Sequence, residues 1–414
     1  MRRLFAHRDA RVYLIGQAFS LLGDTSLWLA VAIWVKELTG SAAEAGLTFF
    51  FFGLSGLLSP LAGFVVDRVR RRPLLFWVNL LSGVMLLGLC AVSSRSQLWL
   101  IYLEMVGYGI SYAFLGSAQS ALLTTMLEPD LLADANGLLR TVREGLRLVA
   151  PLLGAALFAV VGGHVIALID ALTFFIAAGS LLLVRVAEEP PRSLRSETEL
   201  AERWWQEVTA GVRHIRQTVV LRQIVAATAL ALLVVGFFES VDFAVVGEGL
   251  HRPPTFLGVL LAVQGAGALL GGPTAAPLMR RIGPGIMVGL GLGIFAVATL
   301  CFAPAFLPAV LLGAVLAGIA LPWVIVGIYT VLQLRTPATL QGRVYSAADT
   351  VLSVPQTFSI GLGAALVGVI EYRYLLVAMA LVLGASALYL LSRKEQRLVP
   401  AVAGEESLAA SEVA

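Results

Sequence analysis

The decapeptide GFVVDRVRRR, residues 63–72, separates two long apolar stretches and combines one carboxylate with four arginines. A segment with this charge cannot lie in hydrocarbon, so we predict a tight turn at a membrane face. Lysine and arginine concentrate on the cytoplasmic side of membrane proteins, which places this turn inside the cell. Arginines alone would indicate only an ordinary cytoplasmic loop, whereas the ordered spacing G-x-x-x-D-R-x-x-R-R is rarer.

The composition is that of a polytopic membrane protein. Of the 414 residues, 58% are hydrophobic and 13% are charged, against about a quarter charged residues in an average soluble domain. The mean hydropathy is +0.88. The formal net charge of +3 is small, so we expect no nucleic acid partner.

The sequence shows no pattern for a catalytic or cofactor site. Cys90 and Cys301 both fall inside apolar runs, and the four histidines lack the i, i+4 spacing of a metal-ligand pair. No G-x-x-x-x-G-K-[ST] motif is present, so ATP is not expected to be the direct energy source. We therefore predict no metal, no cofactor and no enzymatic activity.

Twelve segments are apolar and long enough to cross a membrane, for which a helix needs about 20 apolar residues. They are 12–35, 43–66, 74–93, 98–127, 137–162, 165–185, 220–247, 255–279, 285–303, 306–332, 341–370 and 373–392. The predicted fold class is therefore an all-α polytopic membrane protein with twelve transmembrane helices. The segment before the first span is basic and lacks a small-x-small cleavage site, so we expect that span to be a retained helix.

The distribution of basic residues predicts the orientation. Lysine and arginine gather in the segments that cytoplasmic termini would place inside, whereas only Lys36, Arg95, Arg252 and Arg373 fall in outside segments. This asymmetry favours both termini in the cytoplasm and a multi-pass protein of the cytoplasmic, or inner, cell membrane.

Hydropathy and charge divide the chain into four parts. Residues 1–185 form an N-terminal six-helix bundle, 186–219 a cytoplasmic linker, 220–392 a C-terminal six-helix bundle, and 393–414 a cytoplasmic tail that we expect to be disordered. Apolar residues recur at helical spacing in the linker. This spacing predicts an amphipathic helix on the inner leaflet, with a plain linker as the alternative.

The two bundles also resemble each other in sequence. Arg68-Val69 of the turn aligns with Arg281-Ile282, so residues 276–285 form a second copy of the turn without its aspartate. Two pseudo-symmetric six-helix bundles around a central cavity are typical of transporters, because the bundles can rock about a site near the midplane.

The turn resembles the signature loop of the major facilitator superfamily. Gly63, Asp67, Arg68, Arg71 and Arg72 match that loop residue by residue. The resemblance implies a conformational latch, in which the aspartate and the arginines hold the two bundles together when the cavity faces outward. It also implies that the protein works as a monomer.

Further motifs are similar to the drug-exporter branch that includes macrolide-efflux proteins. They are GQAFS at 16–20 in the first span and LTGSA at 38–42 before the second. APLLG at 150–154 in the fifth span resembles the Gly-Pro-x-x-Gly antiporter motif, with alanine in place of the first glycine. Pro151 and Gly154 are thereby expected to bend this helix and to allow close packing.

Asp24 is a strong candidate for a functional charge inside the membrane. It lies roughly twelve residues into the first span, about 18 Å along the helix and near the midplane. Gln17, Ser20 and Trp28 share its helical face. Because an intramembrane carboxylate is costly, we interpret Asp24 as a proton-titrating or substrate-facing group, with hydrogen bonding to a neighbouring helix as the structural alternative.

The fifth span contains a polar stripe. Arg140, Arg143, Glu144 and Arg147 follow the spacing i, i+3, i+4, i+7 and share one helical face. Two of the three positive charges are uncompensated. The resemblance to the major facilitator superfamily implies that the fifth span packs near the first, which makes Asp24 a candidate counterion for one of them. The alternative for Arg140 and Arg143 is that they extend to the membrane interface.

Carboxylates recur in the second half. Glu239 and Asp242 lie at i, i+3 in the outer part of the seventh span, and Asp349 shares one face of the eleventh span with Ser353 and Gln356. Two carboxyl groups at this spacing can exchange protons, so we take all three as proton-coupling or substrate candidates. An outer-rim cation funnel or structural pairs are the alternatives.

The remaining polar and aromatic groups complete the expected cavity. Its candidate lining consists of Gln17, Ser20, Trp28, Tyr108, Tyr112 and Gln356, although core packing is the alternative for any single aromatic residue. Glu104 and Asp170, near the outer face, are interpreted as polar groups that help to pack helices.

These features predict a secondary active transporter, namely a proton-coupled exporter of amphiphilic drugs or antibiotics that works by alternating access. Its expected partners are a small amphiphilic substrate, protons and membrane lipid. An exporter or flippase of lipids or siderophores with the same fold is the alternative, in which the positive stripe binds an anionic group. A non-transporting membrane sensor or scaffold is an alternative of another class.

Overall fold

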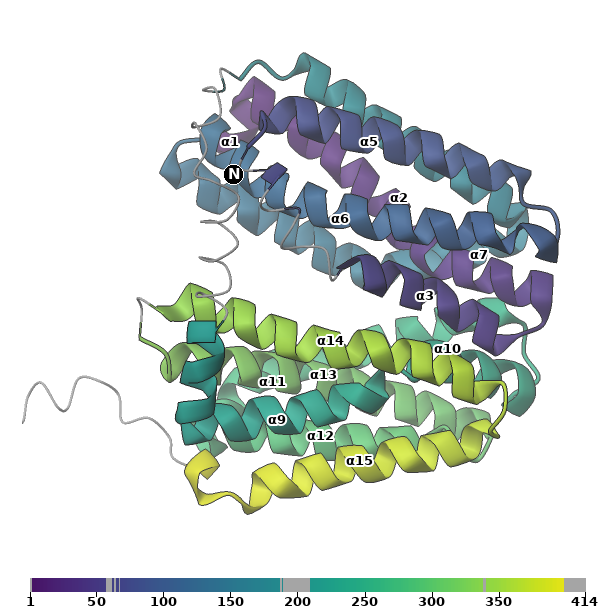
Figure 1. The fold of residues 1–414 in the computed structure, drawn as a ribbon, viewed down its shortest axis with the longest axis vertical. Coiled ribbons are helices and arrows are strands. Elements are labelled where there is room, and N and C mark those ends of the chain that lie inside the picture. Colours follow the sequence, from purple (N-terminus) through teal and green to yellow (C-terminus); the bar gives the residue numbers. More distant parts are fainter. Residues whose placement is uncertain are drawn as a thin grey trace, which may run out of the picture. The chain divides into compact units, whose positions relative to one another are not determined.

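The computed structural model describes residues 2–56, 62, 65–66, 68–186, 188, 209–337 and 340–397. Throughout these ranges the regular secondary structure is helical, and ten helices are long and apolar enough to cross a membrane. Within each part of the chain the long helices run side by side (Figure 1). The prediction of an all-α chain with many apolar spans is confirmed, and the count of twelve spans stays a prediction.

Before the linker, the helices named among the described residues include two short 3₁₀ turns, η1 and η2. They are α1 (Arg2–Ala6), α2 (Arg8–Thr39), α3 (Ala42–Gly56), α5 (Arg71–Gly88), η1 (Leu89–Ala91), η2 (Arg95–Gln97), α6 (Leu98–Met126) and α7 (Pro129–Leu183). The described part of the predicted second span, 43–66, is the short apolar helix α3.

The rest of the chain is divided into more pieces. They are α9 (Val219–Val235), α10 (Phe238–Ala244), η3 (Val245–Gly249), η4 (Pro254–Phe256), α11 (Leu257–Ile282), α12 (Pro284–Cys301), α13 (Leu307–Leu334), α14 (Gln341–Val367), α15 (Tyr372–Ser392) and η6 (Lys394–Arg397). α6, α12, α13 and α15 begin within one residue of their predicted starts.

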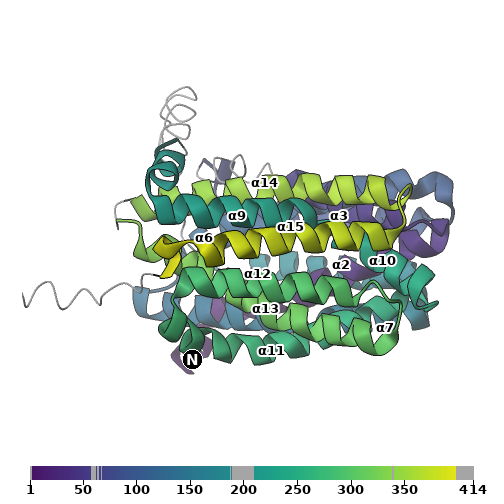
Figure 2. The same ribbon diagram turned by 90° about the horizontal axis from the view of Figure 1, so that it is seen from below.

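The chain falls into two compact units. Unit 1 comprises Met1–Arg195, Gly236–Ala262 and Thr357–Tyr372, and unit 2 comprises the remaining segments Ser196–Val235, Val263–Gln356 and Arg373–Ala414. Unit 1 therefore contains α2 to α7 together with α10, η3 and η4, whereas unit 2 contains α9, α12, α13 and most of α11, α14 and α15. Within unit 2, α12 and α13 pack side by side (Figure 2). The predicted domain boundaries in the linker and at the tail stay predictions.

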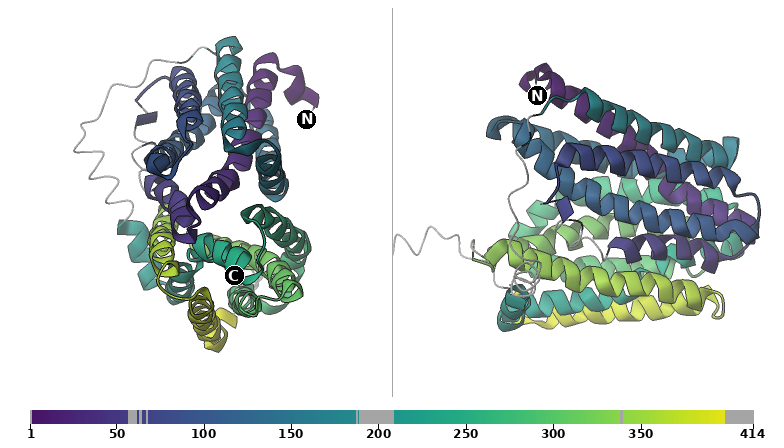
Figure 3. Two further views of the ribbon diagram at one scale, coloured as in Figure 1. Left: turned by 90° about the vertical axis from the view of Figure 1, so that its right-hand side faces the viewer. Right: turned by 45° about the horizontal axis from the view of Figure 1, so that its top comes forward.

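Small residues position the helices of unit 1, whose bundle is seen nearly end-on in Figure 3. A Cβ on Gly16 would lie 2.7 Å from Ser180 Cβ, and a Cβ on Gly23 would lie 3.1 Å from Asp170 Cγ. Glycine at such points lets two membrane helices approach closely. Together the two contacts fix an antiparallel register between α2 and the second half of α7.

α7 contains two of the predicted spans. Its 55 residues are helical except at Gly162, where φ is 75° and ψ is 172°, a backbone conformation that suits glycine. This break falls between the predicted spans 137–162 and 165–185, so they join at a sharp kink. Pro151 and Gly154 lie inside α7 without non-helical dihedral angles, and the bend expected there stays a prediction.

The predicted seventh span, 220–247, is not one continuous helix. α9 ends at Val235, a turn at Gly236 and Phe237 follows, and α10 continues into the π-helical η3. The segment is nevertheless one candidate membrane span, Val219–Gly249, as predicted. The interruption has a local cause, because Gly236 has low helix propensity and the π-turn changes the register of the chain. Glu239 and Asp242 consequently lie on α10, after the break.

The end of the predicted linker and the start of the predicted tail are described. Most of the expected amphipathic helix lies outside the described residues, but 209–217 is helical, and His214 Nε2 lies 3.0 Å from the carbonyl oxygen of Arg335. At the tail, Gln396 is buried and donates to the Val220 carbonyl at 3.0 Å. The predicted disorder from Val399 onward falls outside the described residues.

Candidate functional site

Asp24 is buried halfway along α2. Its side chain is 9% exposed and interacts with the charges of Arg143 and Asp170. Tyr108 of α6 and Ser20, one turn earlier in α2, lie beside the Asp24 carboxyl group. The Asp24 Oδ1 has no hydrogen-bond partner among the described residues. A buried carboxylate with free acceptor capacity can bind a proton or a polar group of a ligand.

An aromatic cluster adjoins this carboxyl group. Trp28, one turn after Asp24, packs against Phe52 of α3 with a centroid distance of 4.6 Å. Phe52 in turn contacts Tyr108 at 5.2 Å and Tyr112 at 5.9 Å. Tyr108 is buried, whereas Tyr112 is half exposed. The structure thus brings together Trp28, Tyr108 and Tyr112, with Phe52 as a central member that the sequence reading had not singled out.

The other predicted lining residues are distributed differently. Gln17 and Ser20 lie on α2 and are 5% and 0% exposed, so both are buried in unit 1. Gln356 is partly buried and belongs to unit 2. As lining groups of a cavity these three stay predictions.

The polar stripe of the fifth span is partly described. Arg143 has an exposed side chain whose charge acts on Asp24, as expected for a counterion. Glu144 and Arg147 belong to α7, but their side chains lie outside the described ones. Arg143 is therefore the member of the stripe that the structure links to the carboxyl group.

Two buried carboxyl groups lie near Asp24 that the sequence reading assigned to helix packing. Asp170 of α7 is 1% exposed and Glu104 of α6 is 5% exposed. Asp170 lies against Gly23, the residue before Asp24, and its charge acts on Asp24 and on Glu104. Sequence spacing gives no sign of this convergence, because the three residues belong to three different helices.

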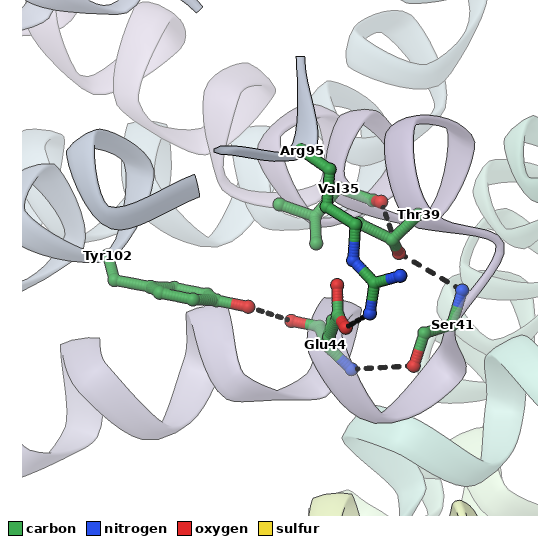
Figure 4. A network of polar contacts seen from close by, with 6 residues as sticks. All are labelled: Val35, Thr39, Ser41, Glu44, Arg95 and Tyr102. Atoms are coloured by element: carbon green, nitrogen blue, oxygen red, sulfur yellow. Dashed lines mark hydrogen bonds and ion pairs between the residues drawn. The ribbon is translucent and has the colours of Figure 1, made fainter. Parts of the chain in front are cut away.

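A polar network joins the end of α2 to α3 and η2 (Figure 4). Ser41 Oγ accepts a hydrogen bond from the Glu44 backbone N–H at 3.2 Å and caps α3. The Glu44 carboxylate forms an ion pair with Arg95, and the Tyr102 hydroxyl donates to the Glu44 carbonyl at 3.1 Å. Lys36 donates to the Gly40 carbonyl at 2.8 Å. This face is the one that charge distribution predicts to be extracellular.

α10 packs against α3 near this face. A Cβ on Gly46 of α3 would lie 2.8 Å from Ser240 Cβ of α10. Glu239 and Asp242 flank Ser240, and the charge of Glu239 acts on Asp242. Both carboxylates are partly buried, so the predicted pair is brought together in unit 1.

Asp349 lies in unit 2 and is exposed on α14. Its charge acts on Tyr329 of α13, whose ring stacks on Tyr345 at 5.9 Å. Asp349 is thus placed beside two tyrosines rather than beside another carboxylate in the described part of unit 2.

The basic turn is described in part. Gly63 and Asp67 lie outside the described residues, whereas Arg71 and Arg72 form the first turn of α5. Arg72 Nε donates to the Leu181 carbonyl at 2.7 Å, and its guanidinium also reaches the Leu182 carbonyl at 3.0 Å. Glu188 accepts from the Arg72 backbone N–H at 2.7 Å. Arg72 therefore ties the end of α7 to the start of α5 within unit 1.

Ligand-binding features of other kinds are limited. Among the described residues no group of three or more His, Cys, Asp or Glu side chains is arranged to hold a metal ion. A cavity of about 250 Å³ lies at the basic turn, lined by Arg70, Phe76, Val186 and Glu188 among others. Asp24 is not among the residues that line this cavity, which include both charged and apolar side chains.

Comparison with known proteins places the chain among transporters. The family model described as Major Facilitator Superfamily matches residues 13–246 and 240–412. The chain is 25% identical over 397 residues to the enterobactin exporter EntS of Citrobacter koseri, covering 92% of this chain and 89% of that protein. It is 25% identical over 174 residues to the macrolide efflux protein A of Streptococcus pyogenes, covering 41% of this chain and 43% of that protein.

Solved structures have the same fold. A bacterial homologue of the iron transporter ferroportin, crystallised in an inward-facing state, superposes with a TM-score of 0.67 at 17% identity. The superposition covers 92% of this chain and 99% of that one. The apolar helices and these matches together make the chain a multi-pass membrane protein.

Proposed function

The chain belongs to the Major Facilitator Superfamily, and we propose that it exports small amphiphilic molecules in exchange for protons. The observation that carries the proposal is Asp24, a buried carboxyl group adjoined by the aromatic cluster of Trp28, Phe52, Tyr108 and Tyr112. Relatives named for enterobactin export and macrolide efflux support the outward direction.

The chemistry of this site suits an amphiphile. Aromatic faces bind the apolar body of a ligand and attract a cationic group through their ring electrons. Asp24 supplies one negative charge, which a proton or a cationic substrate can neutralise. Competition between the two for one carboxylate couples export to proton entry, since the site releases one when it binds the other.

Alternating access completes the mechanism. The two halves of the chain rock about the site, so that protons bind from the extracellular side and substrate from the cytoplasm. In this proposal Glu239, Asp242 and Asp349 are additional proton or substrate groups, and Gln17, Ser20 and Gln356 orient the ligand. The protein acts as a monomer in the cytoplasmic membrane with both termini inside.

The test is efflux of ethidium and of erythromycin from cells that express the chain, with and without a proton uncoupler. We expect Asp24→Asn to abolish uncoupler-sensitive efflux at equal membrane abundance, because asparagine keeps the shape and removes the titratable group. Asp24→Glu, which keeps the carboxyl group, should retain part of the activity. Unchanged efflux in Asp24→Asn would remove this residue from the mechanism.

An anionic substrate, such as a lipid or siderophore head group, is a second candidate. The exposed Arg143, whose charge acts on Asp24, favours it, as does the likeness to an enterobactin exporter over most of the chain. Arg143→Ala should then reduce transport of an anionic probe while leaving ethidium efflux intact. If Arg143→Ala instead reduces ethidium efflux and leaves transport of the anionic probe unchanged, the result would support a cationic substrate. No flux of either probe in proteoliposomes under a pH gradient would favour a sensor or scaffold.

A further inference from the structure

The cavity at the basic turn has no part in the proposed export. Its volume is about 250 Å³, and its lining comes from the start of α5 and from the end of α7 with the residues that follow, all within unit 1. Pockets that enclose a whole drug-sized ligand measure about 300–1,000 Å³. The cavity is therefore large enough for one part of a larger molecule.

Two arginines give the cavity positive charge. Arg72 is held in place by the carbonyls of Leu181 and Leu182 at the end of α7. Arg70 is the N-cap residue of α5, but its exposed side chain forms no cap hydrogen bond with that helix. The Arg70 guanidinium, with five N–H donors, is thus available to an anionic group.

A carboxylate in the same lining has one oxygen without a partner. Glu188 Oε1 accepts from the Arg72 backbone N–H at 2.7 Å and so caps the start of α5. Glu188 Oε2 is buried and has no hydrogen-bond partner among the described residues. Buried polar atoms are almost always paired, so this oxygen marks the place for a hydrogen-bond donor of a ligand.

The two signs of charge together select the ligand. A simple anion would meet the carboxylate of Glu188, and a simple cation would meet Arg70 and Arg72. A group that contains an anion and a cationic donor side by side satisfies both ends of the cavity. A phosphate joined to a primary ammonium has this chemistry, because the phosphate accepts from a guanidinium and the ammonium donates to a carboxylate.

The remaining wall is apolar and continues onto the exposed surface. Phe76 and Leu182 line the cavity, and Leu182 is more than half exposed. Trp77 is also more than half exposed and packs edge to face on Phe76, with ring centroids 5.4 Å apart. Tryptophan is enriched where membrane meets water. Apolar chains attached to the bound group can lie along this surface.

The cavity lies at the level of the lipid head groups. Arg71–Ala91 and Val149–Leu183 are candidate membrane spans, and the cavity is at the start of the first and the end of the second. Charge distribution predicts this end to be cytoplasmic. Basic pockets between membrane helices on the cytoplasmic side bind lipid head groups, so the position favours a lipid over a soluble phosphate ester.

We propose that this cavity binds the head group of a phospholipid that contains a primary amine. The phosphate binds Arg70, the ammonium donates to Glu188 Oε2, and the acyl chains lie against Leu182 and Trp77. The bound lipid joins the start of α5 to the end of α7. This inference does not depend on what the protein transports.

The test is thermal unfolding of the purified full-length chain in detergent, titrated with dioleoyl lipids that differ only in the head group. Phosphatidylcholine keeps the phosphate but has no N–H, so we expect phosphatidylethanolamine to stabilise the chain at about a tenfold lower concentration. Phosphatidylglycerol, which lacks the ammonium, should act like phosphatidylcholine or more weakly. Glycerophosphoethanolamine, the head group without chains, should have no effect at these concentrations.

Two variants separate the two contacts. Glu188→Gln keeps an oxygen for the Arg72 N–H and removes the charge, so it should abolish the preference for phosphatidylethanolamine over phosphatidylcholine. Arg70→Gln should raise the concentrations needed of both lipids by roughly tenfold, because it removes a charge-assisted hydrogen bond to phosphate. Arg213→Gln, at an exposed position in unit 2, is the matched control and should change neither.

Equal stabilisation by phosphatidylethanolamine and phosphatidylcholine would overturn the proposal, as would a stronger effect of phosphatidylglycerol. An equal effect of glycerophosphoethanolamine would show that a soluble ester, and not a lipid, is the ligand. A preference for phosphatidylethanolamine that survives in both variants would place the lipid elsewhere. If Glu188→Gln does not fold, the lipid series on the unaltered chain and on Arg70→Gln decides the question.

Discussion

Gly154 of α7 packs directly against α2, so the methyl group added by Gly154→Ala should push these two helices of unit 1 apart. A Cβ there would lie 2.9 Å from the Ser26 carbonyl carbon of α2 and closer still to its oxygen. Carbon atoms make favourable contact from about 3.5 Å, so α2 and α7 must move apart by at least about 0.6 Å. Backbone atoms cannot rotate away as a side chain could. Overpacking of this kind costs about 1–3 kcal/mol.

Gly145 provides the matched control on the same helix. A Cβ at Gly145 meets no atom within 4 Å, and alanine is favoured over glycine in a helix by about 1 kcal/mol. We therefore expect Gly154→Ala to lower the free energy of unfolding and Gly145→Ala to raise it slightly. The assay is thermal unfolding of both variants in the same detergent. Unfolding is monitored as the loss of the monodisperse peak in size-exclusion chromatography. A Gly154→Ala protein that melts with or above Gly145→Ala would refute the close contact.

Three further outcomes follow from the described contacts. Arg72→Ala frees the carbonyls at the end of α7 and should cost about 1.5–3 kcal/mol in thermal unfolding, whereas Arg70→Ala, at an exposed position, should cost little. Ser41→Ala removes the cap of α3 and should cost about 1 kcal/mol, and Ser96→Ala on the exposed outer turn serves as its control. Cys90, which is exposed in η1 directly after α5, should react with a membrane-impermeant maleimide on intact cells, and Cys90→Ser should react less. Labelling only after permeabilisation would reverse the predicted orientation.

Most helix positions could be predicted because membrane spans are a local property. An apolar run of about 20 residues is required by the hydrocarbon thickness alone, so α6, α12, α13 and α15 begin where the sequence indicated. The kink at Gly162 and the break at Gly236 were less accessible. The kink and the break each depend on whether the residues around the glycine continue the helical hydrogen-bond pattern. Packing against neighbouring helices determines this, and packing cannot be read from the local sequence.

The candidate site was predictable only one helix at a time. Asp24 and Trp28 share a face of α2 by their spacing, and the cost of an intramembrane charge singles out Asp24. Phe52 and Asp170 could not be assigned in this way, because their roles depend on which helix each one meets. The register of α2 against α7 follows from Gly16 and Gly23, two small residues whose partners are far away in the sequence.

The two units differ in their buried charged residues, which suggests different roles for them in transport. The buried carboxylates of the described residues, Asp24, Glu104 and Asp170, all belong to unit 1. In unit 2 the described buried polar residues are uncharged, and Asp349 is exposed. The turn at 63–72 contains an aspartate that its copy at 276–285 lacks. The predicted copies of the turn thus differ in acidic residues, as the two units differ in buried carboxylates among the described residues. If the proposed proton exchange holds, substitutions of the buried carboxylates of unit 1 should change the pH dependence of transport. Substitutions of uncharged residues in unit 2 should instead change substrate preference first.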